Sequence, residues 1–201
     1  VHFHIGSQIP SIRVIKDKRT AVCNTTDFTP KALDEMVRTA VDLARISEPD
    51  EFAGLPAKED LATDMGANLQ LYDETIESLT VDEMKDIVLR AEQAAFDFDN
   101  RITNSEGAEF GAERGQLVLA NSLGFAGSYP YTAASFSVSV IADEPDGKKQ
   151  SDYWFSAERM FHRLQSPEDV GRKAAARVVR KLGGRKIPTC EVPVVWDPAM
   201  T

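Results

Sequence analysis

The sequence predicts an α+β fold, in which an antiparallel β-sheet packs against three main helices at about residues 30–46, 81–98 and 167–182. Two observations carry this prediction. Residues 117–141 show the pattern of strand, polar turn and strand, and three segments with apolar residues at helical spacing each follow a helix-capping signal. A chain of 201 residues with 42% hydrophobic and 27% charged content is large enough and apolar enough to bury a core.

The segment at residues 117–141 organises the predicted sheet. Its two ends are apolar, and its middle at 121–129 carries two glycines, an amide and hydroxyl groups, as a tight turn requires. Serines alternate strictly with apolar residues over 135–140. Because successive side chains of a strand point to opposite faces, this alternation predicts a half-buried antiparallel sheet with a serine face and an apolar face.

Other strand signals lie on both sides of this segment. Residues 152–155 predict a third strand, and we expect its three consecutive aromatic residues to cover the helices. Residues 12–24 predict a separate hairpin with its turn at 16–18. In the segment 101–115, residues 102 and 103 suit a strand edge, and 104–107 have the composition of a turn.

Each predicted helix begins at a cap that the sequence displays. The caps are Thr29 before Pro30, Thr80 with Glu83 three residues later, and Ser166 before Pro167. Residues 48–78 predict an irregular acidic connector with one or two helical turns at 58–65 and an extended piece at 69–73. We therefore expect one amino-terminal α+β domain over residues 1–185, and residues 186–201 as the first strand of a truncated carboxy-terminal domain.

The net charge, the lengths of the apolar runs and the cysteine spacing exclude several classes of binding partner. The net charge of −9 argues against direct nucleic-acid binding, which requires a basic surface. No apolar run approaches the roughly 20 residues that span a bilayer, so we expect no membrane association. The two cysteines lie far apart, and neither has a second ligand at metal-binding spacing. A reduced, cytoplasmic protein is the simplest interpretation.

The sequence offers several arrangements that resemble catalytic or metal sites, and each lacks a required part. A pair of alternating histidines has no third ligand nearby, an acidic series has no histidine, an aspartate pair lacks the spacing of a calcium loop, and a nucleophile trio lacks its turn motif. These are, respectively, His2 with His4, Glu106 with Glu109 and Glu113, Asp97 with Asp99, and Ser122 with His162 and Asp152. We predict no catalytic and no metal-binding residue in this chain.

Motifs spread along the chain in a consistent order resemble the amino-terminal domain of the TldD/PmbA family, and their details are closer to the PmbA (TldE) branch. The resemblance covers roughly residues 13–201. It rests on residues 18–22, 26–29, 50–56, Asp73 after Leu71 and Tyr72, 101–107, the turn Asn121-Ser122-x-Gly124-Phe125, 152–154, 166–168, 186–189 and 193–195.

This resemblance implies a non-catalytic subunit, or its amino-terminal fragment, of a TldD/TldE-type zinc metalloprotease, historically called a modulator of DNA gyrase. The expected partners are a TldD-type subunit in a heterodimer, or a second copy in a homodimer, and a peptide substrate. The family places zinc in a His-Glu-x-x-x-His motif on the TldD-type partner, so no cofactor is expected here. Residues with a possible peptide-contact or structural-turn role are Asn121, Ser122, Gly124, Phe125 and Tyr153.

Two alternatives stay open. One is a stand-alone protein-binding or regulatory domain, related to gyrase or to toxin–antitoxin pairs, without catalysis of its own. The other comes from the first dozen residues, which separately resemble a His-x-His-x-Gly-Ser-Gln stretch of pyridoxal-phosphate-dependent decarboxylases. That second resemblance lacks the Schiff-base lysine and the phosphate loops of its family, so its function is not carried over.

Overall fold

The strand β4 (Ala126–Asp143) is the centre of a three-stranded antiparallel sheet with the order β3–β4–β5. The computed structural model describes residues 8–63 and 69–196. Strand β3 (Ile102–Ala120) and β4 form a long hairpin, and β5 (Lys149–Glu158) pairs with the second half of β4. The described residues form four α-helices beside antiparallel strands, which is the predicted α+β fold.

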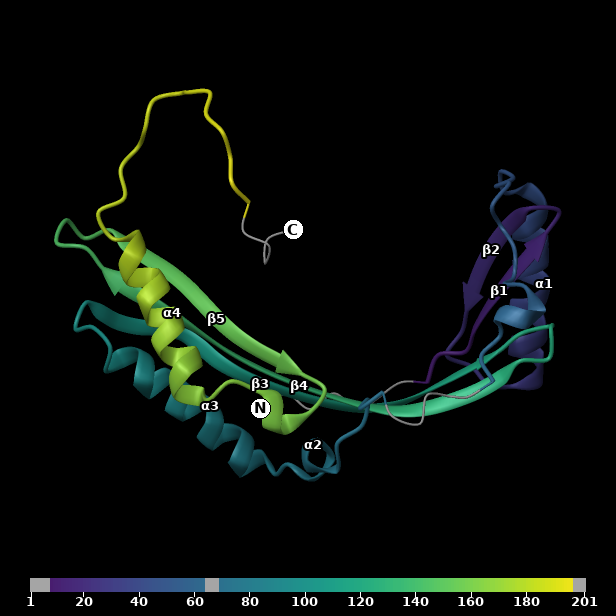
Figure 1. Ribbon diagram of the computed structural model, residues 1–201, viewed down its shortest axis with the longest axis horizontal. Coiled ribbons are helices and arrows are strands. Elements are labelled where there is room, and N and C mark those ends of the chain that lie inside the picture. Colours follow the sequence, from purple (N-terminus) through teal and green to yellow (C-terminus); the bar gives the residue numbers. More distant parts are fainter. Residues whose placement is uncertain (1–7, 64–68, 197–201) are drawn as a thin grey trace. The chain divides into compact units, whose positions relative to one another are not determined.

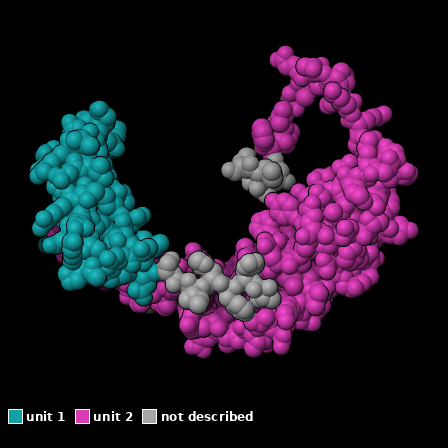
Figure 2. Space-filling model, turned by 180° about the vertical axis from the view of Figure 1, so that it is seen from behind, with its two compact units in different colours: residues 1–62 teal, residues 63–201 magenta. Residues whose placement is uncertain are grey.

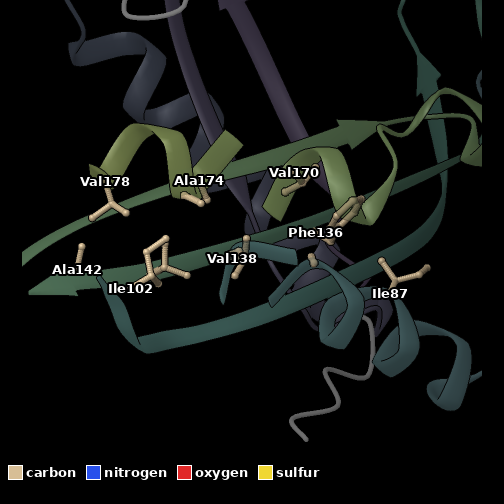
Figure 3. Close-up of a cluster of buried hydrophobic side chains, with 12 residues drawn as sticks. Ile87, Ile102, Phe136, Val138, Ala142, Val170, Ala174 and Val178 are labelled. Carbon is tan, nitrogen blue, oxygen red and sulfur yellow. The ribbon is translucent and has the colours of Figure 1, made fainter. Parts of the chain in front are cut away.

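Helices α3 (Val81–Phe96) and α4 (Pro167–Lys181) cover one face of this sheet (Figure 1). The side chains of β4 alternate as the sequence predicted, with Phe136, Val138 and Val140 buried beneath the helices. Figure 3 shows these apolar side chains meeting those of the two helices. The core consists of Ile87, Ala91, Ala95, Ile102, Phe136, Val138, Val140, Ala142, Val170, Ala174, Ala175 and Val178.

The two helices approach each other closely at Gly171. A Cβ atom at this position would lie 2.0 Å from the backbone oxygen of Ala91 and 3.1 Å from the Cβ of Ala94. The small residues at the crossing let the backbones meet, and the buried alanines of both helices fill the space around it. The distance between α3 and α4 is therefore set by the absence of a side chain at Gly171.

The short helix α2 (Glu74–Ser78) was not expected from the sequence. Asp73 accepts a hydrogen bond from the N–H of Thr75 and so caps α2, and its other carboxylate oxygen accepts one from the N–H of Phe161 at 2.8 Å. The N–H of Asp73 donates to the hydroxyl of Thr132, which is fully buried on β4. Burial raises the pKa of Asp73, but the N–H donors of Phe161 and Thr75 outweigh this effect and hold the pKa below its ordinary value.

Residues 1–62 form a separate unit (Figure 2). Within it, β1 (Ser11–Lys16) and β2 (Arg19–Asn24) make the predicted hairpin, and Asp17 and Lys18 at its turn both have positive φ. Helix α1 (Pro30–Ile46) begins at the Thr29 cap, and a 3₁₀ turn follows at Lys58–Asp60. The buried residues of this unit are Ala21, Ala40 and Ala44.

The second unit, residues 63–201, contains α2, α3, the three-stranded sheet, a 3₁₀ turn at Phe161–Arg163 and α4. The structure thus groups the residues expected to form a single domain over 1–185 as two units, with the boundary in the sequence between residues 62 and 63, inside the irregular connector. Residues 184–196 have no regular secondary structure, so the strand expected there does not form within the described residues. The predicted domain boundary near residue 185 stays a prediction.

Two local predictions were wrong. The turn expected at 104–107 is part of β3, where register shifts between Ile102 and Asn104 and between Ser105 and Gly107 accommodate the turn-like residues as bulges. The aromatic residues of β5 do not all cover the helices. Only Trp154 lies on the helix side, beneath Lys173, whereas Tyr153 and Phe155 are exposed on the opposite face.

The three main helices were predicted correctly, with α3 ending two residues earlier and α4 one residue earlier than expected. In the described part of the chain, no helix combines the length and apolar character that crossing a bilayer requires.

Replacement of Gly171 tests the helix crossing. Because the added methyl group would collide with backbone rather than with a flexible side chain, Gly171→Ala is expected to lower the free energy of unfolding by about 2 kcal/mol or more. This loss would exceed the gain of about 1 kcal/mol that alanine brings to a helix. Chemical denaturation measures this change in the free energy of unfolding.

Gly111→Ala is the control, since its Cβ would meet only the Ser135 hydroxyl at 3.7 Å. Equal stability of Gly171→Ala and the wild type would contradict the close helix crossing at Gly171.

Candidate functional site

The face of the β3–β4–β5 sheet opposite the helices carries the candidate site. On this face β4 presents Ser135, Ser137 and Ser139, whose small side chains form the floor of a groove of about 640 Å³. Glu109 of β3 and the aromatic side chains of Tyr153 and Phe155 on β5 line its two sides. The residues that face the groove are Glu109, Gly111, Ser135, Ser137, Ser139, Tyr153 and Phe155; Phe110 and Phe136 of the same strands also border it, although their side chains pack on the helix side.

The strand register places a carboxylate, a serine and an aromatic ring in one row across the sheet. Glu109 pairs with Ser137, and Ser137 pairs with Phe155. The hydroxyl of Ser137 donates a hydrogen bond to Oε1 of Glu109 at 3.4 Å. The serine therefore orients the carboxylate beside the groove without neutralising its charge.

A second row, one step along the strands, repeats this arrangement. Ser139 pairs with Gly107 on one side and Tyr153 on the other. Its hydroxyl donates to Oε2 of Glu106 at 2.6 Å. Glu106 is the extra residue of the bulge between Ser105 and Gly107, and Gly107 has a φ of +125° that favours glycine.

The aromatic side of the groove is a stacked pair. The rings of Tyr153 and Phe155 lie 6.4 Å apart between centroids, and both residues are about half exposed. Aromatic rings at this distance stack favourably, and their open faces provide apolar contact area for a partner. The predicted site residue Tyr153 thus lines a surface groove.

Two ion pairs of the buried Asp152, on the opposite side of β5, help to hold Tyr153 in place. Asp152 is 7% exposed, and its carboxylate contacts the guanidinium of Arg177 at 3.2 Å and the ammonium of Lys181 at 3.1 Å. It also accepts the N–H of Tyr153 at 2.8 Å. Burial raises the pKa of Asp152, but the Tyr153 N–H and the Lys181 and Arg177 cations outweigh it, so the pKa lies below its ordinary value.

The other four predicted site residues lie together in the turn between β3 and β4. The side-chain oxygen of Asn121 accepts the N–H groups of Leu123 at 3.0 Å and Phe125 at 3.3 Å, and Gly124 has a φ of +93°. These bonds give Asn121 a structural part in the turn. The structure does not bring this turn together with Tyr153, whose row crosses β3 at Gly107 rather than at the hairpin end. A peptide contact by Asn121, Ser122, Gly124 or Phe125 stays a prediction.

Asp152, which the sequence presented as a member of a possible nucleophile trio, is held in another role. Asp152 is bonded to cations of α4, and within the part of the chain that the structure describes no group of three His, Cys, Asp or Glu residues could hold a metal ion. His2 and His4, with most of the decarboxylase-like stretch, lie outside the described residues.

Comparison with known protein families identifies the chain. The sequence model of the PmbA/TldA metallopeptidase central domain matches residues 74–182, which is most of the second unit. The model of PmbA/TldA metallopeptidase domain 1 matches residues 11–44 in the first unit. The chain belongs to the PmbA/TldD metallopeptidase family. The family resemblance predicted from the sequence motifs is confirmed.

Individual relatives agree with this assignment. Metalloprotease PmbA of Escherichia coli O157:H7 is 38% identical over 185 residues, which are 92% of this chain and 40% of that protein. The metalloprotease PmbA homologue of Haemophilus influenzae is 36% identical over the same shares of both chains. This chain thus spans about two fifths of the length of the curated relatives it matches.

Solved structures share the fold. A proposed modulator of DNA gyrase from Bacteroides thetaiotaomicron superposes with a TM-score of 0.74 at 25% identity, covering 88% of this chain and 40% of that one. TldE from Thermococcus kodakarensis superposes with a TM-score of 0.63 at 19% identity, covering 85% and 37%. The second likeness shows the fold alone.

Sequence reasoning missed most of the groove. Glu106 and Glu109 had been considered only as part of an acidic series that lacks a histidine, and Phe155 had been expected to face the helices. The alternating serines were a readable signal for one face of β4, but the residues beside them depend on the register of three strands. Only Tyr153 was singled out in advance.

Replacement of Asp152 tests the ion pairs behind Tyr153. Asp152→Asn is expected to lower the free energy of unfolding near neutral pH by about 1–3 kcal/mol, since it leaves two cations without their partner in a partly buried setting. Because the folded-state pKa is depressed, this contribution is present above roughly pH 4 and is lost as pH falls through the folded pKa. The variant should therefore lose less stability on acidification than the wild type.

Urea denaturation at a series of pH values measures both effects. Glu158→Gln removes a carboxylate from an exposed position on the same strand and is the control for net charge. A wild type and an Asp152→Asn variant with parallel pH profiles would show that the Asp152 carboxylate does not stabilise the fold in this way.

Proposed function

We propose that this chain is part of the non-catalytic, TldE-type subunit of a two-subunit zinc metalloprotease that processes peptides in the cytoplasm. The observation that carries the proposal is membership in a metallopeptidase family together with 38% identity to metalloprotease PmbA, since the sequence motifs resemble the PmbA (TldE) branch, for which the zinc motif is expected on the partner. Zinc and the hydrolytic step belong, in this proposal, to a TldD-type partner.

The groove supports a part for this subunit in peptide contact. Its serine floor runs from Ser135 to Ser139 along β4, so an extended chain fits it better than a compact small molecule does. Tyr153 and Phe155 supply apolar contact area, while the serine floor supplies hydroxyl groups. The subunit would then help to hold a peptide for hydrolysis on the partner.

The test is reconstitution. The full-length protein is co-expressed with a TldD-type subunit and purified through a tag on one of them. We expect a heterodimer by light scattering, and cleavage of an unfolded test peptide that requires both subunits and is abolished by removing zinc with a chelator. A variant TldD-type subunit without its His-Glu-x-x-x-His histidines provides the inactive control.

Other outcomes point to other assignments. A homodimer that cleaves peptide without the partner would contradict the non-catalytic role. Absence of any complex, together with specific capture of another protein by this chain alone, would favour a stand-alone regulatory domain, the alternative that the sequence left open.

A further inference from the structure

We propose that the groove on the free face of the sheet binds an extended polypeptide segment carrying lysine or arginine at alternate positions. The proposal deepens the peptide contact proposed above by naming the class of segment that binds. It rests on the proposed function for the idea that the groove contacts a peptide at all. Its evidence is the charge, spacing and width of the groove.

Two carboxylates give this face of the sheet a negative charge: Glu109 lines the groove, and Glu106 lies beside it at the lining residue Ser139. Glu106 and Glu109 accept hydrogen bonds from Ser139 and Ser137, which orient the carboxylates but leave their charge in place. Among the described residues, no ion pair involves either glutamate, because the sheet's cations Arg114 and Lys149 pair with Glu77 and Asp143. A cationic partner would complete this arrangement, and an acidic one would be repelled.

The bulge in β3 is responsible for half of this charge. Residues 107, 109 and 111 face the groove side, so unbroken alternation would direct the side chain of residue 106 toward the helices. The inserted residue changes this direction, and Glu106 instead meets the Ser139 hydroxyl on the groove side. Bulges re-aim side chains in this way near functional sites.

The spacing of the rows matches an extended chain. Glu109–Ser137–Phe155 and Glu106–Ser139–Tyr153 are separated by two residues along β4, which is roughly 7 Å. Side chains at positions i and i+2 of an extended segment project to the same face with the same separation. Two cationic side chains at alternate positions can therefore each meet one carboxylate.

The width also suits cationic side chains. The carboxylates and the rings lie on strands on either side of β4, so the two sides of the groove are about 10 Å apart, twice the spacing of adjacent strands. A segment above the serines can direct its ammonium or guanidinium groups to the carboxylates, while its aliphatic stems lie against Tyr153 and Phe155. A wholly apolar segment would instead bury the glutamates without a partner, at a cost in free energy.

The experiment measures binding of short fluorescent peptides to the full-length protein by anisotropy. The peptides share an extended, glycine-spaced backbone and carry lysine, glutamate or glutamine at alternate positions. We expect the lysine peptide to bind at least about tenfold more tightly than the glutamine peptide, and the glutamate peptide more weakly than either. Raising the salt concentration should weaken only the lysine peptide, since exposed ion pairs are screened.

Charge-removing variants locate the binding. The double variant Glu106→Gln with Glu109→Gln keeps the acceptors for both serine hydroxyls and should weaken the lysine peptide about five- to tenfold. Glu113→Gln, which removes an exposed carboxylate from the same strand beyond the groove, should change affinity less than twofold. Circular dichroism and thermal melting check that all variants are folded.

Equal affinity for the lysine and glutamine peptides, or unchanged lysine-peptide affinity in the double variant, would overturn the proposal; a groove covered by another part of the full-length protein would give the first result. The outcome is separate from that of the proposed function. If the reconstituted complex cleaves peptides but shows no preference for basic ones, the subunit role stands and this inference is rejected. If the protein binds basic peptides but forms no cleavage complex, this inference stands and the subunit role is rejected.

Discussion

The alternation of side chains along β4 is the constraint on which the second unit depends. Residues 136, 138 and 140 are buried under α3 and α4, and the serines between them form the floor of the groove. Because β4 is the central strand, its alternation also fixes which residues of β3 and β5 share each face. A register slip of one residue would place serines in the core and remove the groove at the same time.

Because side chains alternate, two neighbouring residues of β5 lie on opposite faces of the sheet, one in contact with the helices and one in the groove. Asp152 faces the helices and is held by Arg177 and Lys181, while Tyr153 faces the groove. The two are joined by the Tyr153 N–H, which bonds the Asp152 carboxylate. The ion pairs therefore fix the strand from behind, and the aromatic surface in front needs no packing partner of its own.

Local signals were sufficient to predict the helices and the central hairpin. Caps such as Thr80 with Glu83 act over a few residues, and their hydrogen bonds form as expected. The failures came where local and long-range effects compete. Residues 104–107 have turn composition, yet pairing with β4 keeps them in a strand, and Gly107 with positive φ absorbs the conflict as a bulge. Helix α2 was missed because it is only five residues long, despite the Asp73 cap.

The groove could not be predicted because its composition depends on register, which the sequence does not display. Glu109 and Phe155 are 46 positions apart, and only the pairing of both strands with Ser137 brings them into one row. Glu106 depends additionally on one inserted residue. With the bulge removed, its carboxylate would face the helices, where burial of an unpaired charge is costly. The bulge therefore serves both the fold and the site. It keeps the Glu106 carboxylate away from the helix side of the sheet and places it beside the groove, at Ser139.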